Sequence, residues 1–152
     1  MSINSVLTVC TGNICRSPLA EALLKREAPH LTVSSAGVGA LIGHPADPHA
    51  CTVGEQHGLD LSAHRARQIN GQITNEHDLI LVVEPGQAKW ITQRFPQSRG
   101  RVYLLGHWMD QASVPDPYRQ SLEQFEIIYD AIDRQLATWL PRLGVTSPST
   151  AT

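Results

Sequence analysis

A cysteine and an arginine stand six positions apart in the segment CTGNICRS, in which Cys10 is followed by Arg16 and Ser17. A thiolate is a reactive nucleophile, and a guanidinium can hold two oxygens of a tetrahedral oxyanion at once. Between them, Gly12 and Asn13 are residue types that adopt the unusual backbone conformations of a tight anion-binding loop. The spacing therefore predicts a loop that binds one phosphoryl group and places a sulfur beneath it.

The elements on either side of this segment support the prediction. An aliphatic run at residues 6–9 precedes it, and a stretch with helical periodicity at residues 18–27 follows it. A loop between a strand and a helix lies at the helix N-terminus, where free amide groups and the helix dipole favour an anion. The same groups would stabilise a Cys10 thiolate, to which the Ser17 hydroxyl could donate. The GxxxxGK[ST] pattern of nucleotide-binding loops is missing, so the expected ligand is a single phosphoryl group.

Four short aliphatic runs have the length and continuity of strands that are buried on both faces. They lie at residues 6–9, 31–33, 79–83 and 102–105. Helix-like stretches separate them, which predicts right-handed crossovers and a parallel sheet covered by helices on both sides. Ligands of such sheets bind at the carboxyl ends of the strands, where the loop after residue 9 lies.

The helices are expected at residues 18–27, 49–57 and 87–95, and in a last stretch between Ser121 and Pro141. In that stretch Ser121 and Gln124 have the spacing of a capping box, and Pro141 ends the pattern. Its apolar residues recur at spacings of three and four: Leu122, Phe125, Tyr129, Ile132, Leu136 and Trp139.

Length and composition indicate one domain, because 152 residues with 41% hydrophobic content suffice for a single core. We expect the domain to span residues 1–143 and residues 144–152 to form a disordered tail. The net charge of −2, with both signs interspersed, argues against nucleic-acid binding and a polybasic membrane anchor. The chain has neither a membrane-length apolar run nor a secretory signal, so we expect a cytoplasmic monomer that does not insert into membranes.

Cysteines and histidines bear on redox and metal chemistry. Cys10, Cys15 and Cys51 are too few for a disulfide framework and fit a reducing compartment, with Cys51 expected in the core. The seven histidines show no HExxH motif and no other ligand spacing. We therefore expect no metal site and no cofactor.

The segment CTGNICRSP resembles the signature of the low-molecular-weight protein tyrosine phosphatases. SAG at residues 35–37, ARQI at 66–69 and DPY at 116–118 extend the resemblance over nearly the whole chain. The resemblance implies a single-domain, three-layer α/β/α fold with a four-stranded parallel sheet, of the phosphotyrosine protein phosphatase I type. It also implies hydrolysis of phosphotyrosine through a covalent cysteinyl phosphate, without a metal ion.

Expulsion of an alkoxide or phenolate needs a proton donor. Asp116 lies between two prolines and matches the family's DPY, so the resemblance makes it the general acid, whereas Asp47 in the other Asp-Pro pair is assigned to a turn. The expected catalytic residues are thus Cys10, Arg16 and Asp116. The expected substrate-binding residues are Thr11, Gly12, Asn13, Ile14, Cys15, Ser17, Leu41 and Tyr118.

Four of these residues carry more specific expectations. Relatives that act on phosphoarginine have a threonine where Ile14 stands, so this apolar residue favours an aryl ring, and it is expected to pack in the core as well. Leu41 and Tyr118 are expected on opposite walls of the site, although Leu41 could instead cap the core and Tyr118 could pack against the last helix. Cys15 is either a redox partner that protects Cys10 through a disulfide or a small packing residue.

The segments GALIGHPADP and LLGHW resemble the bacterial subgroup that works with membrane tyrosine autokinases in capsule or exopolysaccharide export. The implied substrate is the tyrosine-rich cytoplasmic tail of such a kinase. An arsenate reductase of the same fold is one alternative, but it needs further redox cysteines, and LILVVEPGQAKW contains none. A non-catalytic phosphopeptide-binding module is another, but it would need neither Cys10 nor Asp116.

Overall fold

A four-stranded parallel sheet forms the centre of the computed structural model, which describes residues 2–145. The strand order is β2-β1-β3-β4, and all three neighbouring pairs are parallel. The strands are β1 (Ser5–Cys10), β2 (Thr32–Gly37), β3 (Leu79–Val82) and β4 (Val102–Leu104). Each expected aliphatic run overlaps one of these strands, so the predicted parallel sheet is confirmed.

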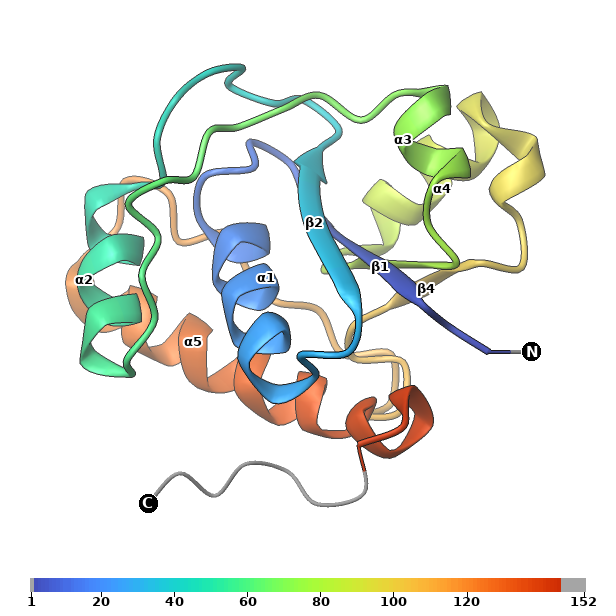
Figure 1. The fold of residues 1–152 in the computed structure, drawn as a ribbon. Coiled ribbons are helices and arrows are strands. Elements are labelled where there is room, and N and C mark those ends of the chain that lie inside the picture. The colour runs from blue at the N-terminus through green and yellow to red at the C-terminus, as the bar shows by residue number, and fades with distance from the viewer. Residues whose placement is uncertain (1, 146–152) are drawn as a thin grey trace.

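Helices cover both faces of the sheet, as the alternation of elements predicts (Figure 1). One face is covered by α1 (Arg16–Glu27), α2 (Pro48–Gln56) and α5 (Leu122–Ala137), and the other by α3 (Gly71–Asn75) and α4 (Pro85–Arg94). The three-layer arrangement is therefore the one implied by the family resemblance.

The strands contribute to two apolar cores because successive side chains point to opposite faces. Val6 and Leu81 pack in the core beneath α1, α2 and α5, whereas Leu7 and Ile80 pack in the core beneath α3 and α4. All four side chains are almost completely buried. This two-sided burial explains why the strands read as continuous apolar runs without polar alternation.

Two helical features differ from the expectation. The short α3 was not predicted, because a helix of five residues has too few turns to show periodicity; Asn70 caps it by accepting a hydrogen bond from the Ile73 amide at 2.8 Å. The last helix begins as predicted, with the Ser121 hydroxyl accepting from the Gln124 amide at 3.3 Å. It ends at Ala137, before Trp139, because the chain tightens there into a 3₁₀ turn, η2 (Leu140–Leu143).

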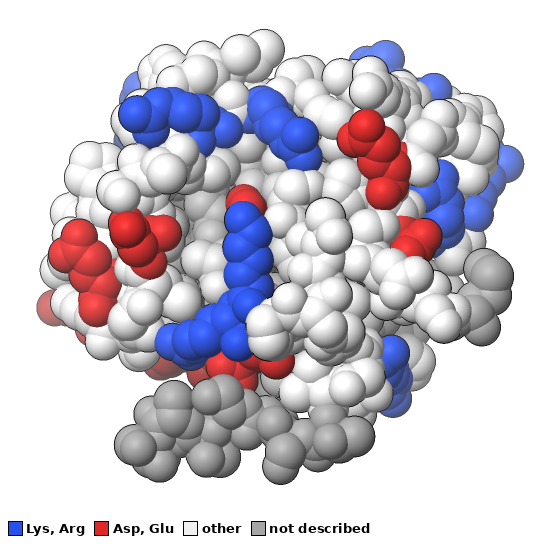
Figure 2. Space-filling view, in the orientation of Figure 1, with Lys and Arg blue, Asp and Glu red and all other residues white. Residues whose placement is uncertain are grey.

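The C-terminal end of the described chain packs on the fold. Gly144 ends η2 in the left-handed conformation, and the Val145 amide donates to Leu140 O at 2.9 Å while its side chain packs against the core. The remainder of the expected tail, residues 146–152, lies outside the described residues. Across residues 2–145, no helix has the length and apolar character needed to cross a membrane. Basic and acidic side chains are interspersed on the face in Figure 2.

Candidate active site

The loop between β1 and α1, residues 11–15, has its carbonyl groups turned away from its interior. Each of the five consecutive carbonyls from Cys10 to Ile14 accepts a hydrogen bond from outside the loop, at 2.6 to 3.1 Å. The amides of Val38, Gly39 and Leu41 donate to the carbonyls of Cys10, Thr11 and Gly12, respectively. The His64 ring Nε2 donates to the Asn13 carbonyl, and the Asp47 amide donates to the Ile14 carbonyl. The carbonyl ends of these peptide units are thus bound to neighbouring segments.

The amide groups of the same loop have no such partners. Within the described chain, no backbone N–H of residues 11–15 donates to another group. Successive peptide N–H groups that converge at a helix N-terminus form an anion-binding nest. The loop thus leaves these amide groups available as donors, as the predicted oxyanion cradle requires.

The unusual backbone conformation in this loop belongs to Asn13, whose φ is 60°. The expectation for Gly12 is wrong in this respect, since Gly12 is not among the residues with positive φ. A Cβ atom added to Gly12 would meet Ile14 and Leu41 at ordinary contact distances. The glycine that the cradle needs is Gly37, where an added Cβ would lie 2.3 Å from the backbone oxygen of Thr11.

Asn13 and Ser17 lie behind the cradle and connect it to the nucleophile. The completely buried Asn13 amide donates from Nδ2 to Ser17 Oγ at 2.8 Å and to Ser35 Oγ at 3.0 Å, while its Oδ1 accepts from the Arg67 amide. Ser17 Oγ lies 2.9 Å from Cys10 Sγ. Because Ser17 Oγ accepts from Asn13, its own hydrogen is available for the sulfur. Neither side chain lines the cavity, so both act through the loop and the sulfur.

Arg16 is only 1% exposed, although its side chain carries a charge. Nη1 forms an ion pair with Glu84 Oε2 at 2.9 Å and donates to Val114 O at 2.7 Å, and Nη2 lies 3.9 Å from Asp116 Oδ2. Nε is buried and has no partner in the described chain. A buried donor without a partner is costly, so Nε would gain stability from an acceptor that binds in the site.

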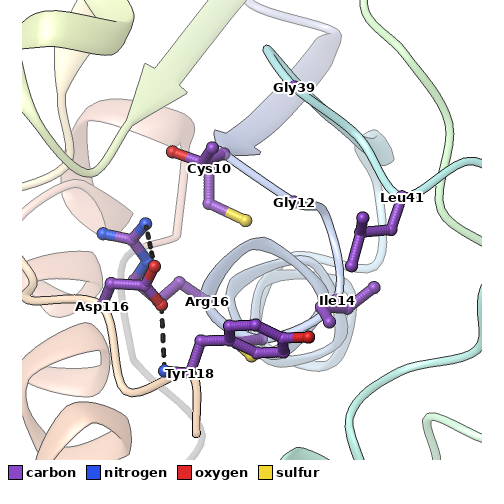
Figure 3. Close-up of a pocket in the computed structure, with 10 residues that line it drawn as sticks. Cys10, Gly12, Ile14, Arg16, Gly39, Leu41, Asp116 and Tyr118 are labelled. Carbon is purple, nitrogen blue, oxygen red and sulfur yellow. Dashed lines mark hydrogen bonds and ion pairs between the residues drawn. The ribbon is translucent and has the colours of Figure 1, made fainter.

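A cavity of about 180 Å³ opens above the cradle and gathers most of the predicted site (Figure 3). Cys10 lies at its base, and Leu41 and Tyr118 stand at its rim, 36% and 41% exposed. Both side chains thus line the cavity and neither is part of the buried core, while their contact with a substrate ring stays a prediction. The complete lining is Cys10, Thr11, Gly12, Ile14, Cys15, Arg16, Gly39, Leu41, Asp116 and Tyr118.

Asp116 reaches the cavity from the loop before α5 (Figure 3). Its Oδ1 accepts from the Tyr118 amide at 3.1 Å, and its side chain remains 50% exposed. The carboxyl group is therefore oriented by its own turn and still open to solvent. Asp47, the other aspartate before a proline, instead caps α2 by accepting from the His49 amide at 2.9 Å.

Ile14 and Cys15 both line the cavity and pack in the core. Burial raises the pKa of the Cys15 thiol above its ordinary range, and the Asp47 carboxylate acts in the same direction. All three cysteines are free thiols, and Cys51 is partly buried against the core, as expected. The disulfide between Cys10 and Cys15 remains a prediction for oxidising conditions.

Two residues at the start of α4, which were not predicted from the sequence, hold the cradle. Glu84 forms the ion pair with Arg16, and Gln87 donates to Thr11 Oγ1 at 3.2 Å and to Glu84 Oε2 at 3.3 Å. A signal existed for Glu84, because it is a charged residue directly after the aliphatic run at residues 79–83, at the carboxyl edge of the sheet. Gln87, in contrast, reads as an ordinary helix residue. Among residues 2–145 no cluster of three or more His, Cys, Asp or Glu side chains could hold a metal ion.

The chain resembles known proteins in both its sequence and its fold. Residues 5–148 match the family described as low molecular weight phosphotyrosine protein phosphatase. The chain is 47% identical over 141 residues to the low molecular weight protein-tyrosine-phosphatase Wzb of Salmonella typhimurium, covering 93% of this chain and 95% of that protein. It is also 47% identical to the probable low molecular weight protein-tyrosine-phosphatase EpsP of Ralstonia nicotianae, covering 93% of this chain and 97% of that protein. Among solved structures, Vibrio vulnificus Wzb in complex with benzylphosphonate is similar, with a TM-score of 0.89, 42% identity and coverage of 92% of this chain and 99% of that chain.

Proposed function

We propose that this chain, which belongs to the family of low molecular weight phosphotyrosine protein phosphatases, hydrolyses phosphotyrosine in proteins with Cys10 as nucleophile, Arg16 as oxyanion ligand and Asp116 as general acid and base. The observation that carries this proposal is the direction of the peptide units in the loop at residues 11–15. Five outward carbonyls leave the amides of residues 11–15 free, and the buried Arg16 Nε has no acceptor. A tetrahedral dianion above Cys10 would supply acceptors to both sets of donors.

In the first step the Cys10 thiolate attacks phosphorus. The S–P bond forms while the bond between phosphorus and the tyrosyl oxygen breaks, and the electron pair of that bond leaves with the oxygen. Asp116, protonated, gives its proton to this oxygen, so tyrosine departs as a neutral phenol. Arg16 and the loop amides bind the equatorial oxygens throughout the transfer.

In the second step the cysteinyl phosphate is hydrolysed. Asp116, now a carboxylate, takes a proton from a water molecule, whose oxygen attacks phosphorus as the S–P bond breaks. Phosphate leaves and Cys10 returns to the thiolate, which the Ser17 hydroxyl at 2.9 Å would stabilise. No metal ion, oxidant or further co-reactant is required for this cycle.

The apolar walls of the cavity support an aryl ester as the substrate. Ile14, Leu41 and Tyr118 surround the entrance to the cradle and offer apolar surface to a flat ring. Benzylphosphonate, which Vibrio vulnificus Wzb binds, combines a benzyl ring with a tetrahedral phosphonate in the same way. Phosphoserine would leave this apolar surface unused, because its phosphorus lies closer to the peptide backbone.

The test is the turnover of p-nitrophenyl phosphate and of a phosphotyrosine peptide, without added metal, by the wild type and by Cys10→Ser. We expect turnover by the wild type alone, binding of vanadate by both proteins, and phosphorus on residue 10 in rapidly quenched reactions. Vanadate binding without turnover by the wild type would instead favour a phosphopeptide-binding module. Turnover that survives in Cys10→Ser would refute the covalent mechanism.

For the partner we propose the tyrosine-rich cytoplasmic tail of a membrane tyrosine autokinase in capsule or exopolysaccharide export, dephosphorylated by a cytoplasmic monomer. The support is the resemblance of residues 39–48 and 104–108 to that bacterial subgroup. The test is a pull-down with Asp116→Ala, which would retain phosphorylated substrate at the cradle. Capture of an autokinase, released by vanadate, is the expected result. Capture of only unrelated phosphoproteins would refute this assignment.

A further inference from the structure

A second depression, which we call the α4 groove, adjoins the phosphate cavity. It has a volume of about 320 Å³, and its lining residues are Thr11, Val38, Glu84, Pro85, Gly86, Gln87 and Trp90. Thr11 lines both the groove and the phosphate cavity, and Val38 directly precedes Gly39 of the cavity. The two depressions therefore adjoin at Thr11, which we call the ridge between them.

The walls of the groove are apolar, and most of its polar groups already form hydrogen bonds within the protein. Val38, Pro85 and Trp90 provide the apolar surface, while the buried Gln87 amide is held by Thr11 and Glu84. The Glu84 carboxylate accepts from Arg16 and the Gln87 side chain through Oε2 and forms a capping box with Gln87, yet its side chain remains 40% exposed. The groove thus offers apolar contact beside a carboxylate that is still partly open to solvent.

The charges around the groove disfavour both ionic classes of ligand. The Glu84 carboxylate would repel a carboxylate or a second phosphate. A cation would compete with the Arg94 guanidinium, which already lies 4.5 Å from the centre of the Trp90 ring, and would find the Glu84 carboxylate already paired with Arg16. A neutral, flat side chain avoids both conflicts, and one with a terminal donor can also use Glu84.

We propose that the α4 groove binds the aromatic side chain of a residue that flanks the phosphotyrosine, with tyrosine preferred. The ring would pack against Val38, Pro85 and Trp90, and the hydroxyl would donate to the partly exposed Glu84 carboxylate. An extended peptide advances by roughly 3.3–3.6 Å per residue, so a residue one or two positions from the phosphotyrosine can cross the ridge at Thr11. This inference rests on the proposed phosphotyrosine phosphatase activity and adds a sequence preference to it.

The experiment measures kcat/KM for peptides with one phosphotyrosine and with Tyr, Phe, Ala or Asp at each position from −2 to +2. We expect Tyr to exceed Ala by roughly five- to tenfold at one flanking position, as partial burial of an aromatic ring would give. Phe should lie between Tyr and Ala there, and Asp should fall below Ala. The ratio of Tyr to Ala is used because it cancels any change in the basal rate.

The variant Gly86→Trp is designed to occupy the groove, because Gly86 lines it and an added Cβ atom there meets no other heavy atom within 4 Å. Gln93→Trp, at an exposed position on the same helix, is the matched control. The Tyr-to-Ala ratio should fall to about one in Gly86→Trp and keep its wild-type value in Gln93→Trp.

Three results would overturn the groove assignment: equal rates for Tyr and Ala peptides in the wild type, an unchanged ratio in Gly86→Trp, or the same loss in Gln93→Trp. Each leaves the phosphatase activity itself intact, because wild-type turnover of p-nitrophenyl phosphate is measured in parallel. Loss of that turnover would instead overturn the proposed function.

Discussion

Removal of the ion pair between Glu84 and Arg16 tests whether Glu84 positions the guanidinium or whether the guanidinium is merely buried. Glu84 and Val114 O hold Nη1, at 2.9 Å and 2.7 Å, which leaves Nε and Nη2 for the oxyanion. In Glu84→Ala the cation stays buried with only the Val114 carbonyl on that end. We therefore expect the Arg16 guanidinium to rotate away from its productive orientation and the fold to lose stability.

The magnitude follows from the unequal burial of the two partners. Breaking a fully buried pair costs about 3–5 kcal/mol and an exposed pair about 0.2–1 kcal/mol. The side chain of Arg16 is 2% exposed and that of Glu84 is 40% exposed, so this pair lies between the two classes. We expect a loss of roughly 1–3 kcal/mol in the free energy of unfolding. A displaced catalytic group can cost about 10²-fold in rate, so kcat/KM should fall roughly 10- to 100-fold.

The assay combines urea unfolding with the turnover of p-nitrophenyl phosphate, a substrate too small to reach the α4 groove. Glu84→Gln should retain most of the activity, because its amide oxygen can still accept from Nη1. Glu126→Ala is the control, since it removes one negative charge at an exposed position of α5. If Glu84→Ala matches the wild type in both stability and kcat/KM, Glu84 does not position Arg16.

Three further predictions concern the general acid, the second thiol and the glycine beside the cradle. Asp116→Asn should lower kcat by about 10²- to 10⁴-fold for poor leaving groups and less for activated aryl phosphates; equal losses across a leaving-group series would remove the proton-transfer role. Because burial raises the pKa of Cys15, this thiol should stay protonated between about pH 7 and 8.5, where an ordinary thiol begins to ionise. Iodoacetate should then label Cys10 and not Cys15 in that range, as peptide mapping would reveal, and faster labelling of Cys15 would contradict the assigned environment. Gly37→Ala should cost about 1–3 kcal/mol in urea unfolding, because its Cβ would lie 2.3 Å from a backbone oxygen of the loop. Gly39→Ala, whose added Cβ meets a methyl group at an ordinary 3.7 Å, is the control, and equal stability of the two variants would refute the steric argument.

The elements of the fold could be predicted because their signals are local. The four aliphatic runs each mark a strand, since both faces of a covered parallel sheet are apolar. The cap at Ser121 is likewise contained in four consecutive residues. The unpredicted α3 and the early end of α5 fall where a single turn is decided by packing and not by periodicity.

The sequence by itself determined the reactive loop, because Cys10 and Arg16 are close enough along the chain for strand, loop and helix to bring them together. It also determined, through family resemblance, that Asp116 belongs with them. Only the tertiary structure decided how Arg16 is held, since its bond to Val114 O joins residues 98 positions apart and Glu84 reaches it from another strand end. The direction of the loop amides was decided in the same way, by donors on the segments around residues 38–47 and 64 that bind the opposite ends of the peptide units. Long-range hydrogen bonds leave no periodic trace in a single sequence, and they set the orientation on which the chemistry depends.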